Sequence, residues 1–380
     1  MINGRELLDS LKKNGISFFS GVADSTLGEF ATSLAADGGV IHRAAVNEGV
    51  AVAQAVGYFL ATGKTPCVYM QNSGLGNAVN PLTSLIGQSL VNCPMVMIIG
   101  WRGAPGRPDE IQHSKMGGIT PSLLSLLGVH YECLNETENL EAQVRGLAEI
   151  TNKTSSPAAL LVRPGAINGL TKNHAAYSKP SLTVRSAVEK IVSMLDDDIV
   201  VSTTGYVSRV LHSVSLECGR PVTQNFYNVG SMGHASSVAA ELSLQLDGRN
   251  VVCLDGDGAF LMHMGSVLNH SFSWKQGCRS SFMHVVLDNG VYESTGGQAC
   301  ISKSVGSISG IMREAEYERV FCSLEELERE LSLLRRDGGF ESVGLIGAHI
   351  LVEEDCGNAE PRPNVILREH NESFRFGISG

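Results

Sequence analysis

The stretch VVCLDGDGAFLMH, residues 251–263, decides the fold and raises the question of function. A short apolar run, typical of a buried strand, ends abruptly in Asp-Gly-Asp-Gly before a helix-like pattern begins. Glycines at such a turn let the backbone approach a ligand closely, and Asp257 offers a hard carboxylate oxygen. A helix N-terminus favours phosphate, which this carboxylate would repel unless a divalent cation lies between them. Because Asp-Gly is also a common turn dipeptide, the segment alone leaves a purely structural role open.

A second segment of the same kind follows. In VVLDNGVYESTGGQ, residues 285–298, an apolar run again ends in Asp-Asn-Gly, and Asn289 lies 32 positions after Asp257. Neighbouring parallel strands end at the same edge of a sheet, so we expect Asp257 and the amide oxygen of Asn289 to share one cation such as Mg²⁺. An EF-hand is excluded, because Ala259 and Phe260 occupy positions where that loop needs an oxygen ligand and a glycine. A dinucleotide-binding GxGxxG is also absent.

Strand-like and helix-like runs alternate along the whole chain, which predicts an α/β fold with two doubly wound, mostly parallel sheets. Periodicity is lost only between the halves, so we expect one domain over residues 1–165, a linker over 166–183 and a second domain over 184–380. Ligands of such sheets lie beyond the carboxyl ends of the strands. The main expected strands are ISFFSG (16–21), PCVYMQN (66–72), PMVMIIGW (94–101), DIVVSTTG (198–205), NVVCLDG (250–256) and FMHVVLDNG (282–290).

Composition narrows the function classes. The chain has 380 residues, a formal net charge of −10 and no basic cluster, which argues against nucleic acid as a partner. The nine cysteines form no CxxC pair, as expected for reduced thiols in the cytoplasm. No apolar run is long enough to span a membrane, and the N-terminal segment lacks the apolar stretch of a signal peptide.

The two strand-end motifs together resemble the metal–diphosphate motif of thiamine diphosphate enzymes. The resemblance implies thiamine diphosphate and Mg²⁺ as cofactors, with Asp257, Asn289 and the backbone carbonyl of Val291 as metal ligands. The family pattern usually ends in Asn-Asn, so Asp288 is a departure. Around the metal, the turn residues Gly256, Gly258 and Ala259 would approach the diphosphate.

Further segments resemble the remaining parts of that cofactor site. Glu48, in AAVNEGVAVAQAVGY, would hydrogen-bond the pyrimidine and promote its imino tautomer; an ordinary first-turn glutamate is the alternative. In NVGSMGHASS, the Gly230 carbonyl would accept from the pyrimidine amino group, and Met232 would support the bent cofactor or merely fill the core. The resemblance also assigns cofactor contacts, or an ordinary turn, to three small residues, Ser231, Thr204 and Gly205.

The resemblance narrows to the family of phosphonopyruvate decarboxylases, with sulfopyruvate decarboxylases as close relatives. It covers nearly the whole chain and includes IIGWRGAPGRPDEIQH, TTGYVSR and NGVYESTGGQ. The family has a pyrimidine-binding and a diphosphate-binding domain without a middle domain, and its active sites lie between subunits. The resemblance therefore implies at least a homodimer. Departures from the family pattern are Ala23, Tyr206 and the pair Val291–Tyr292, of which the last lies beside the substrate.

The implied reaction is decarboxylation of 3-phosphonopyruvate to phosphonoacetaldehyde and CO₂ in phosphonate biosynthesis. Asp24 and His113 match polar active-site positions of decarboxylases, although a helix N-cap and a surface-loop histidine are ordinary alternatives. Arginine suits a phosphonate dianion. The substrate-binding candidates, each of which could instead be a solvated charge or a turn residue, are Asn72, Asn77, Arg102, Arg107, Lys115 and Tyr292.

Two other functions remain open from the sequence. One is decarboxylation of sulfopyruvate or another 2-oxo acid. The other is a non-catalytic protein that binds a nucleotide through the Asp-Gly turn and Mg²⁺, in which Glu48 and the VGSMG segment would have no role.

Overall fold

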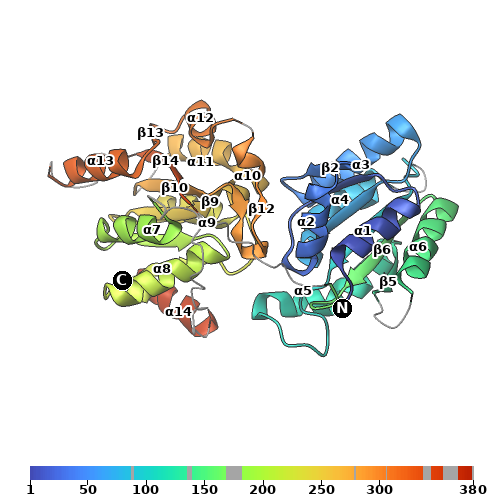
Figure 1. The fold of residues 1–380 in the computed structure, drawn as a ribbon. Helices are drawn as coiled ribbons and strands as arrows, with labels where there is room; N and C mark the ends of the chain where they lie inside the picture. Colours follow the sequence, from blue (N-terminus) through green and yellow to red (C-terminus); the bar gives the residue numbers. More distant parts are fainter. Residues whose placement is uncertain are drawn as a thin grey trace. The chain divides into compact units, whose positions relative to one another are not determined.

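The computed structural model divides the chain into two compact units (Figure 1). One comprises Met1–Asn173 with Ser294–Gln298, and the other His174–Glu293 with Ala299–Gly380. Most of the expected linker, residues 168–181, lies outside the described residues. The structure describes residues 1–86, 90–134, 139–167, 182–277, 280–304, 306–336, 344–353 and 367–378.

The first unit is a parallel six-stranded sheet in the order β2-β1-β3-β4-β6-β5, with helices on both faces. Its strands are β1 (Phe18–Gly21), β2 (Ile41–Ala44), β3 (Cys67–Gln71), β4 (Met95–Gly100), β5 (His130–Cys133) and β6 (Pro157–Val162). Its helices are α1 (Gly4–Lys13), α2 (Gly28–Ala36), α3 (Glu48–Thr62), α4 (Leu75–Ser84), α5 (Ile111–Leu126) and α6 (Leu140–Thr154), with 3₁₀ turns η1 (Ser25–Leu27) and η2 (Asn72–Gly74).

The second unit has a parallel six-stranded sheet in the order β13-β14-β10-β9-β7-β8. Its strands are β7 (Ile199–Ser202), β8 (Asn225–Tyr227), β9 (Val251–Gly256), β10 (Phe282–Asp288), β13 (Arg319–Phe321) and β14 (Leu345–Leu351). The helices are α7 (Val184–Ser193), α8 (Tyr206–Glu217), α9 (Ala235–Gln245), α10 (Asp257–Met262), α11 (Ser266–Lys275), α12 (Ile308–Glu314), α13 (Leu324–Arg336) and α14 (Leu367–Ile378). Short elements complete the chain, namely η3 (Val222–Gln224), β11 (Val291–Tyr292), η4 (Glu293–Thr295), β12 (Gln298–Ala299) and η5 (Ile301–Lys303).

These two parallel sheets confirm the predicted fold class. Among the described residues, no third sheet domain lies between the two units. The strands are near-continuous apolar runs because both faces of each sheet are covered; all six residues of β4 are buried. No described helix has both the length and the apolar character needed to cross a membrane.

Side-chain alternation sorts the residues of each strand between two layers of helices. In the first unit, Phe19 points into the core under α1, α2 and α6, whereas the next residue, Ser20, donates a hydrogen bond to Gln54 of α3 on the other face. In the second unit, Val252 and Leu254 face α7, α8 and α13. Their neighbours Cys253 and Asp255 therefore face the other layer.

The predicted turns lie where the fold places ligands. The Gly-containing segments SGVADS, NSGLGN, TTGYVS, DGDGAF and DNGVYES follow β1, β3, β7, β9 and β10 at their carboxyl ends. The strand-end placement predicted from the sequence is thus confirmed, and it puts the candidate residues at the binding edge of each sheet.

One local detail differs from the sequence expectation. The helix pattern after the Asp-Gly turn is interrupted: α10 begins at Asp257 itself and ends at Met262, and α11 starts at Ser266. The C-terminal helix α14 buries His370 and Phe374 against the rest of the second unit. His370 Nε2 lies 2.9 Å from the backbone oxygen of Asn225, which can only accept, so Nε2 donates this hydrogen bond.

Candidate active site and cofactor site

The two acidic turns of the second unit meet at one edge of its sheet. β9 and β10 are adjacent and parallel, with Gly256 opposite Leu287. This register brings Asp257 and Asp288 to a common partner: the Ser302 hydroxyl lies 2.6 Å from Asp257 Oδ2 and 3.1 Å from Asp288 Oδ1. Both carboxylates are more than nine-tenths buried. Sequence reasoning missed Ser302, which no recognisable motif marks.

Asp288, which departs from the family pattern, makes several hydrogen bonds at this edge of the sheet. His349 Nε2 lies 2.9 Å from Asp288 Oδ2, and the Gly290 amide donates to Asp288 Oδ1 at 2.9 Å. Burial acts to raise the pKa of Asp288, but the hydrogen bonds with His349 and then Ser302 outweigh it, so the pKa is lowered overall. The pKa of Asp257 is raised, first by burial and then by the nearby charge of Asp288.

Such a pair of carboxylates fits a divalent cation. One oxygen of each buried carboxylate contacts the same hydroxyl group, that of Ser302. A bound cation would offset the free-energy cost of burying the two charges and would reduce the repulsion between them. Asn289 lies beside them, but its amide is used within its own turn: Oδ1 accepts from the Val291 amide at 3.1 Å, and Nδ2 donates to Glu293 at 2.9 Å.

A small-residue cradle lies next to the acidic turn. A Cβ atom added at Gly258 would lie 2.5 Å from the Tyr292 ring and 3.3 Å from Met232 Cε, so only glycine fits there. Ser231 adopts a positive φ of 53° just before Met232. The Thr204 hydroxyl donates to the Val229 carbonyl at 2.9 Å and ties the end of β7 to this segment.

The remaining predicted cofactor residues lie around the same group of small residues. Gly205, with φ 92°, precedes α8, and Gly256 precedes α10. A Cβ at Gly233 would lie 3.0 Å from the Ala259 carbonyl, so the segment around Gly230 packs closely on α10. The structure therefore brings the predicted diphosphate, amino-group and apolar supports together in one unit.

In the first unit, Glu48 is held at the start of α3. Its carboxylate is 5% exposed, and Asn77 Nδ2 donates to Oε2 at 2.7 Å. Burial raises the Glu48 pKa, and the Asn77 hydrogen bond opposes that rise. A Cβ at Gly74 would lie 2.2 Å from Glu48 Oε1. Asn77, predicted at the substrate, thus contacts the predicted catalytic carboxylate directly.

Asp24 is completely buried at the end of β1. Neither carboxylate oxygen has a hydrogen-bond partner among the described residues, so the helix-capping alternative lacks its hydrogen bond. Burial raises the Asp24 pKa to about 6. The carboxyl group lies against Gly100, where a Cβ would be 1.8 Å from Asp24 Oδ2.

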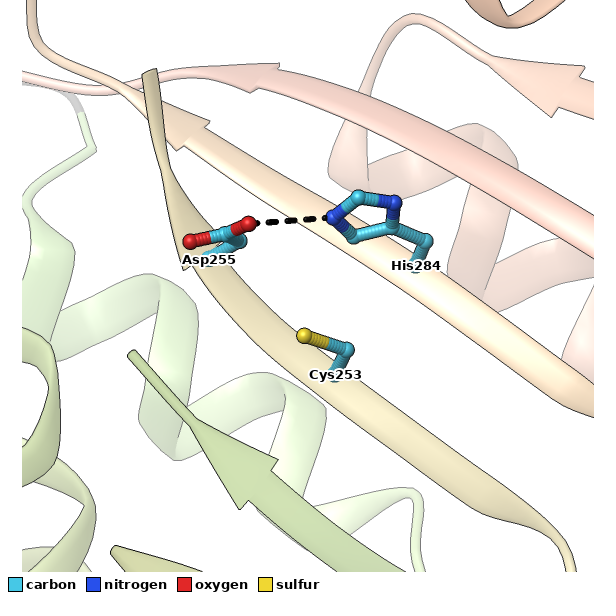
Figure 2. Close-up of side chains that lie close together, drawn as sticks. All are labelled: Cys253, Asp255 and His284. Carbon is cyan, nitrogen blue, oxygen red and sulfur yellow. Dashed lines mark hydrogen bonds and ion pairs between the residues drawn. The ribbon is translucent and has the colours of Figure 1, made fainter. Parts of the chain in front are cut away.

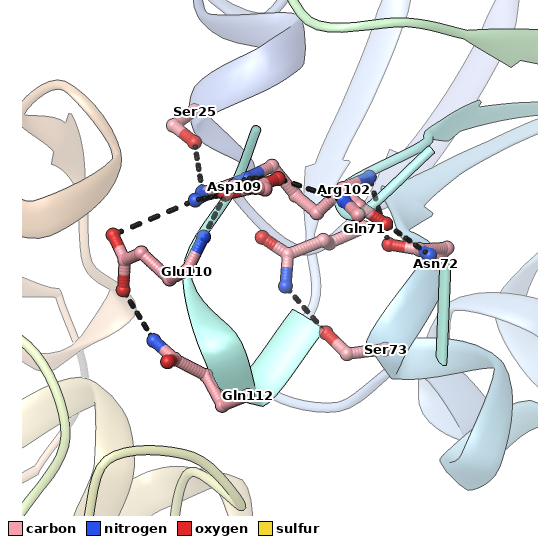
Figure 3. Close-up of polar contacts among 9 residues, drawn as sticks. Ser25, Gln71, Asn72, Ser73, Arg102, Asp109, Glu110 and Gln112 are labelled. Carbon is pink, nitrogen blue, oxygen red and sulfur yellow. Dashed lines mark hydrogen bonds and ion pairs between the residues drawn. The ribbon is translucent and has the colours of Figure 1, made fainter. Parts of the chain in front are cut away.

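The predicted anion-binding loop forms its own polar network (Figure 3). Arg102 makes a forked pair of hydrogen bonds to Asp109, at 2.8 Å and 2.6 Å, and also contacts Ser25 and Glu110. The Arg102 hydrogen bonds are the largest cause of the lowered Asp109 pKa. Asn72 is buried and clasps the backbone of Arg102 through both ends of its amide.

The other predicted substrate residues are more open. Arg107 is exposed and donates to the Pro164 carbonyl at 3.3 Å, and Lys115 is exposed on α5. His113, predicted as a catalytic residue, is half-buried on the first turn of α5, where its backbone packs against Gly103.

Family comparisons agree with this geometry. Residues 2–120 match the N-terminal TPP-binding domain of thiamine pyrophosphate enzymes, and residues 203–321 match the C-terminal TPP-binding domain. These two matches show that the chain is a thiamine pyrophosphate enzyme, as the sequence motifs predicted.

Full-length relatives narrow the class. The chain is 31% identical to the phosphonopyruvate decarboxylase of Streptomyces viridochromogenes, over 100% of this chain and 96% of that protein. It is 32% identical to the one from Streptomyces hygroscopicus, over 99% and 94%. A sulfopyruvate decarboxylase of Methanosarcina acetivorans is 30% identical over 64% of each chain. The chain belongs to the phosphonopyruvate decarboxylase family and is a 2-oxo acid decarboxylase.

Asp24→Asn should stabilise the protein at neutral pH. The native pKa of about 6 lies above the ordinary value of 3.8, so the stability contributed by protonated Asp24 is full below pH 3.8 and is lost as pH rises through 6. At pH 7.5 the neutral amide should raise the free energy of unfolding by up to about 3 kcal/mol. Denaturant unfolding at pH 7.5 and pH 5 measures the difference, which should shrink at the lower pH; a constant difference contradicts the assignment.

Gly74→Ala should displace the Glu48 carboxylate, because the new methyl group would overlap Oε1. A misplacement of this size predicts a loss of about 100-fold in kcat. Gly76→Ala is the matched control, since its Cβ would meet nothing within 4 Å. Steady-state kinetics of both variants test the prediction, and equal kcat values would show that the position of Glu48 is not critical.

Proposed function

We propose that this chain catalyses the Mg²⁺- and thiamine diphosphate-dependent decarboxylation of 3-phosphonopyruvate to phosphonoacetaldehyde and CO₂, as a step of phosphonate biosynthesis. The full-length similarity to two phosphonopyruvate decarboxylases carries the substrate assignment. Sulfopyruvate is the alternative substrate, favoured by the partial match to a sulfopyruvate decarboxylase.

The second unit would hold the diphosphate and the metal. Asp257, Asn289 and the Val291 carbonyl are the proposed Mg²⁺ ligands, for which Asn289 must exchange its present hydrogen bond to the Val291 amide. Gly256, Gly258, Ala259, Thr204 and Gly205 would surround the diphosphate. Gly230, Ser231 and Met232 would support the pyrimidine and the bend between the rings, which agrees with the close packing of this segment on α10.

The bound thiamine diphosphate supplies the carbon nucleophile and the electron sink for decarboxylation. Glu48 would hydrogen-bond the pyrimidine, and its burial keeps water from competing for that bond. Asn77 would orient the Glu48 carboxylate through the 2.7 Å hydrogen bond. We place Asp24 and His113 as proton donors near the substrate, since a buried carboxyl with a pKa of about 6 can be protonated near neutral pH.

The phosphonate requires cations that are not already neutralised. Arg102 contacts two acidic residues and Ser25, so we propose that it mainly stabilises the loop. It would also lie at the edge of the substrate site. Arg107 and Lys115 are the better candidates for gripping the dianion. Asn72 would act by fixing the backbone at Arg102, and Tyr292 would line the substrate side of the cradle.

We further infer a homo-oligomer, at least a dimer, whose sites form between the pyrimidine-binding domain, residues 1–165, of one subunit and the diphosphate-binding domain, residues 184–380, of another. Cytoplasmic location is part of the same proposal, supported by the free state of all seven described cysteines.

Phosphonoacetaldehyde formation is the decisive assay. The purified chain with thiamine diphosphate and Mg²⁺ should turn over phosphonopyruvate with a higher kcat/KM than sulfopyruvate or pyruvate. A preference for sulfopyruvate would move the assignment to the alternative, and a preference for pyruvate would refute the anion-binding role of the loop.

Glu48→Gln should abolish turnover while leaving cofactor binding largely intact, because the amide can still contact the pyrimidine but cannot exchange a proton with it. Product assays and calorimetric titration with thiamine diphosphate and Mg²⁺ measure the two effects separately. Undiminished activity would falsify the role of Glu48. Titration with ATP and Mg²⁺ in its place tests the nucleotide-binding alternative.

A further inference from the structure

Asp255, the first acid of the Asp-Gly-Asp-Gly turn, has no role in the proposed cofactor site. It is fully buried at the end of β9, and His284 of β10 lies beside it on the same face of the sheet (Figure 2). His284 Nε2 is 3.3 Å from Asp255 Oδ2. The other carboxylate oxygen accepts from the amide of Gly256 at 3.0 Å. Asp255 therefore joins the buried layer behind the sheet to the first peptide of the turn.

The contact continues as a chain of buried polar groups. His284 Nδ1 lies 3.2 Å from the Tyr317 hydroxyl, which lies 3.0 Å from His270 Nδ1. All four side chains are 5% exposed or less. They come from β9, from β10, from the loop before β13 and from α11, so the chain connects the sheet with the helical layer on this face.

Donor and acceptor rules fix the first hydrogen bond of this chain. A carboxylate can only accept, so His284 donates to Asp255 from Nε2. The Tyr317 hydroxyl then bridges the Nδ1 atoms of His284 and His270. The remaining ring nitrogen, His270 Nε2, is buried without a hydrogen-bond partner among the described residues.

A metal site is the competing interpretation of the same group. Ligand atoms of Cys253, Asp255 and His284 lie within 4.8 Å of one another. However, the His284 nitrogen that faces this point carries the proton given to Asp255, and the second ring nitrogen is occupied by Tyr317. A metal bound to these three residues would have to break the hydrogen bond between His284 and Asp255. The geometry therefore favours a hydrogen-bonded support of the turn.

We propose that Asp255 is a positioning residue for the metal-binding turn and that His284, Tyr317 and His270 fix its carboxylate. By holding the Gly256 amide, Asp255 sets the orientation of the peptide that leads directly into Asp257 and α10. Groups that orient metal ligands from behind contribute strongly to metal affinity. The inference rests on the proposed function, in which Asp257 binds Mg²⁺ with thiamine diphosphate.

Three variants separate positioning from packing. His284→Phe keeps an aromatic ring but removes both hydrogen bonds, whereas His284→Gln keeps an amide donor for Asp255. Cys253→Ala is the matched control, because Cys253 is equally buried beside the chain and makes no part of it. The readouts are the Mg²⁺ dissociation constant at saturating thiamine diphosphate, measured by calorimetry, and the melting temperature of each cofactor-free variant.

The expected result is Mg²⁺ binding about 10- to 100-fold weaker in His284→Phe, largely restored in His284→Gln and close to wild type in Cys253→Ala. If His284→Phe does not fold, Tyr317→Phe removes one hydroxyl and should weaken Mg²⁺ binding in the same direction, by about tenfold at most. Equal Mg²⁺ affinity in His284→Phe and Cys253→Ala, or no recovery in His284→Gln, overturns the proposal. Failure of the wild-type chain to bind Mg²⁺ with thiamine diphosphate would instead refute the proposed function.

Discussion

The parallel pairing of β9 with β10 is the constraint on which the candidate cofactor site depends. It places two strand ends at one edge of the sheet and brings Asp257 and Asp288 to the same serine hydroxyl. A shift of the register by one residue would turn every side chain of a strand to the opposite face. The apolar residues Val252 and Leu254 would then leave the core under α7 and α8, so core packing and site geometry are fixed by the same register.

The first unit uses burial for a different purpose. Glu48, at the start of α3, and Asp24, after β1, are both buried, and desolvation raises their pKa values. Glu48 receives a hydrogen bond from Asn77 that offsets part of this effect, whereas Asp24 has none among the described residues. Two carboxyl groups with such different hydrogen-bond surroundings are suited to different roles in the site.

The sequence predicted the sheets, their strand-end turns and the adjacency of the two acidic motifs, because apolar strands and Gly-rich turns are encoded locally. It could not predict partners that arrive from distant segments. Ser302 follows a stretch of small residues without a motif, and His349 lies within an apolar strand where a lone histidine has no distinctive signal. Arg102 looked like an anion ligand by composition, yet Asp109, seven residues later, folds back to neutralise it. Whether Asn289 and Val291 bind a metal stays a prediction.

Asp288 shows how a change in one motif position is accommodated by a distant residue. An asparagine there would add no charge, whereas an aspartate puts a second buried carboxylate beside Asp257 and raises the pKa of that residue. His349, on the neighbouring strand β14, bonds the outer oxygen of Asp288 and keeps its pKa low. The repulsion between the two carboxylates then raises the pKa of Asp257. A cation bound by Asp257 would reduce this repulsion directly. A metal bound at this edge would therefore be attracted by more negative charge than the common Asn-Asn pattern offers. Without a metal, the hydrogen bond with His349 stabilises the additional carboxylate of Asp288.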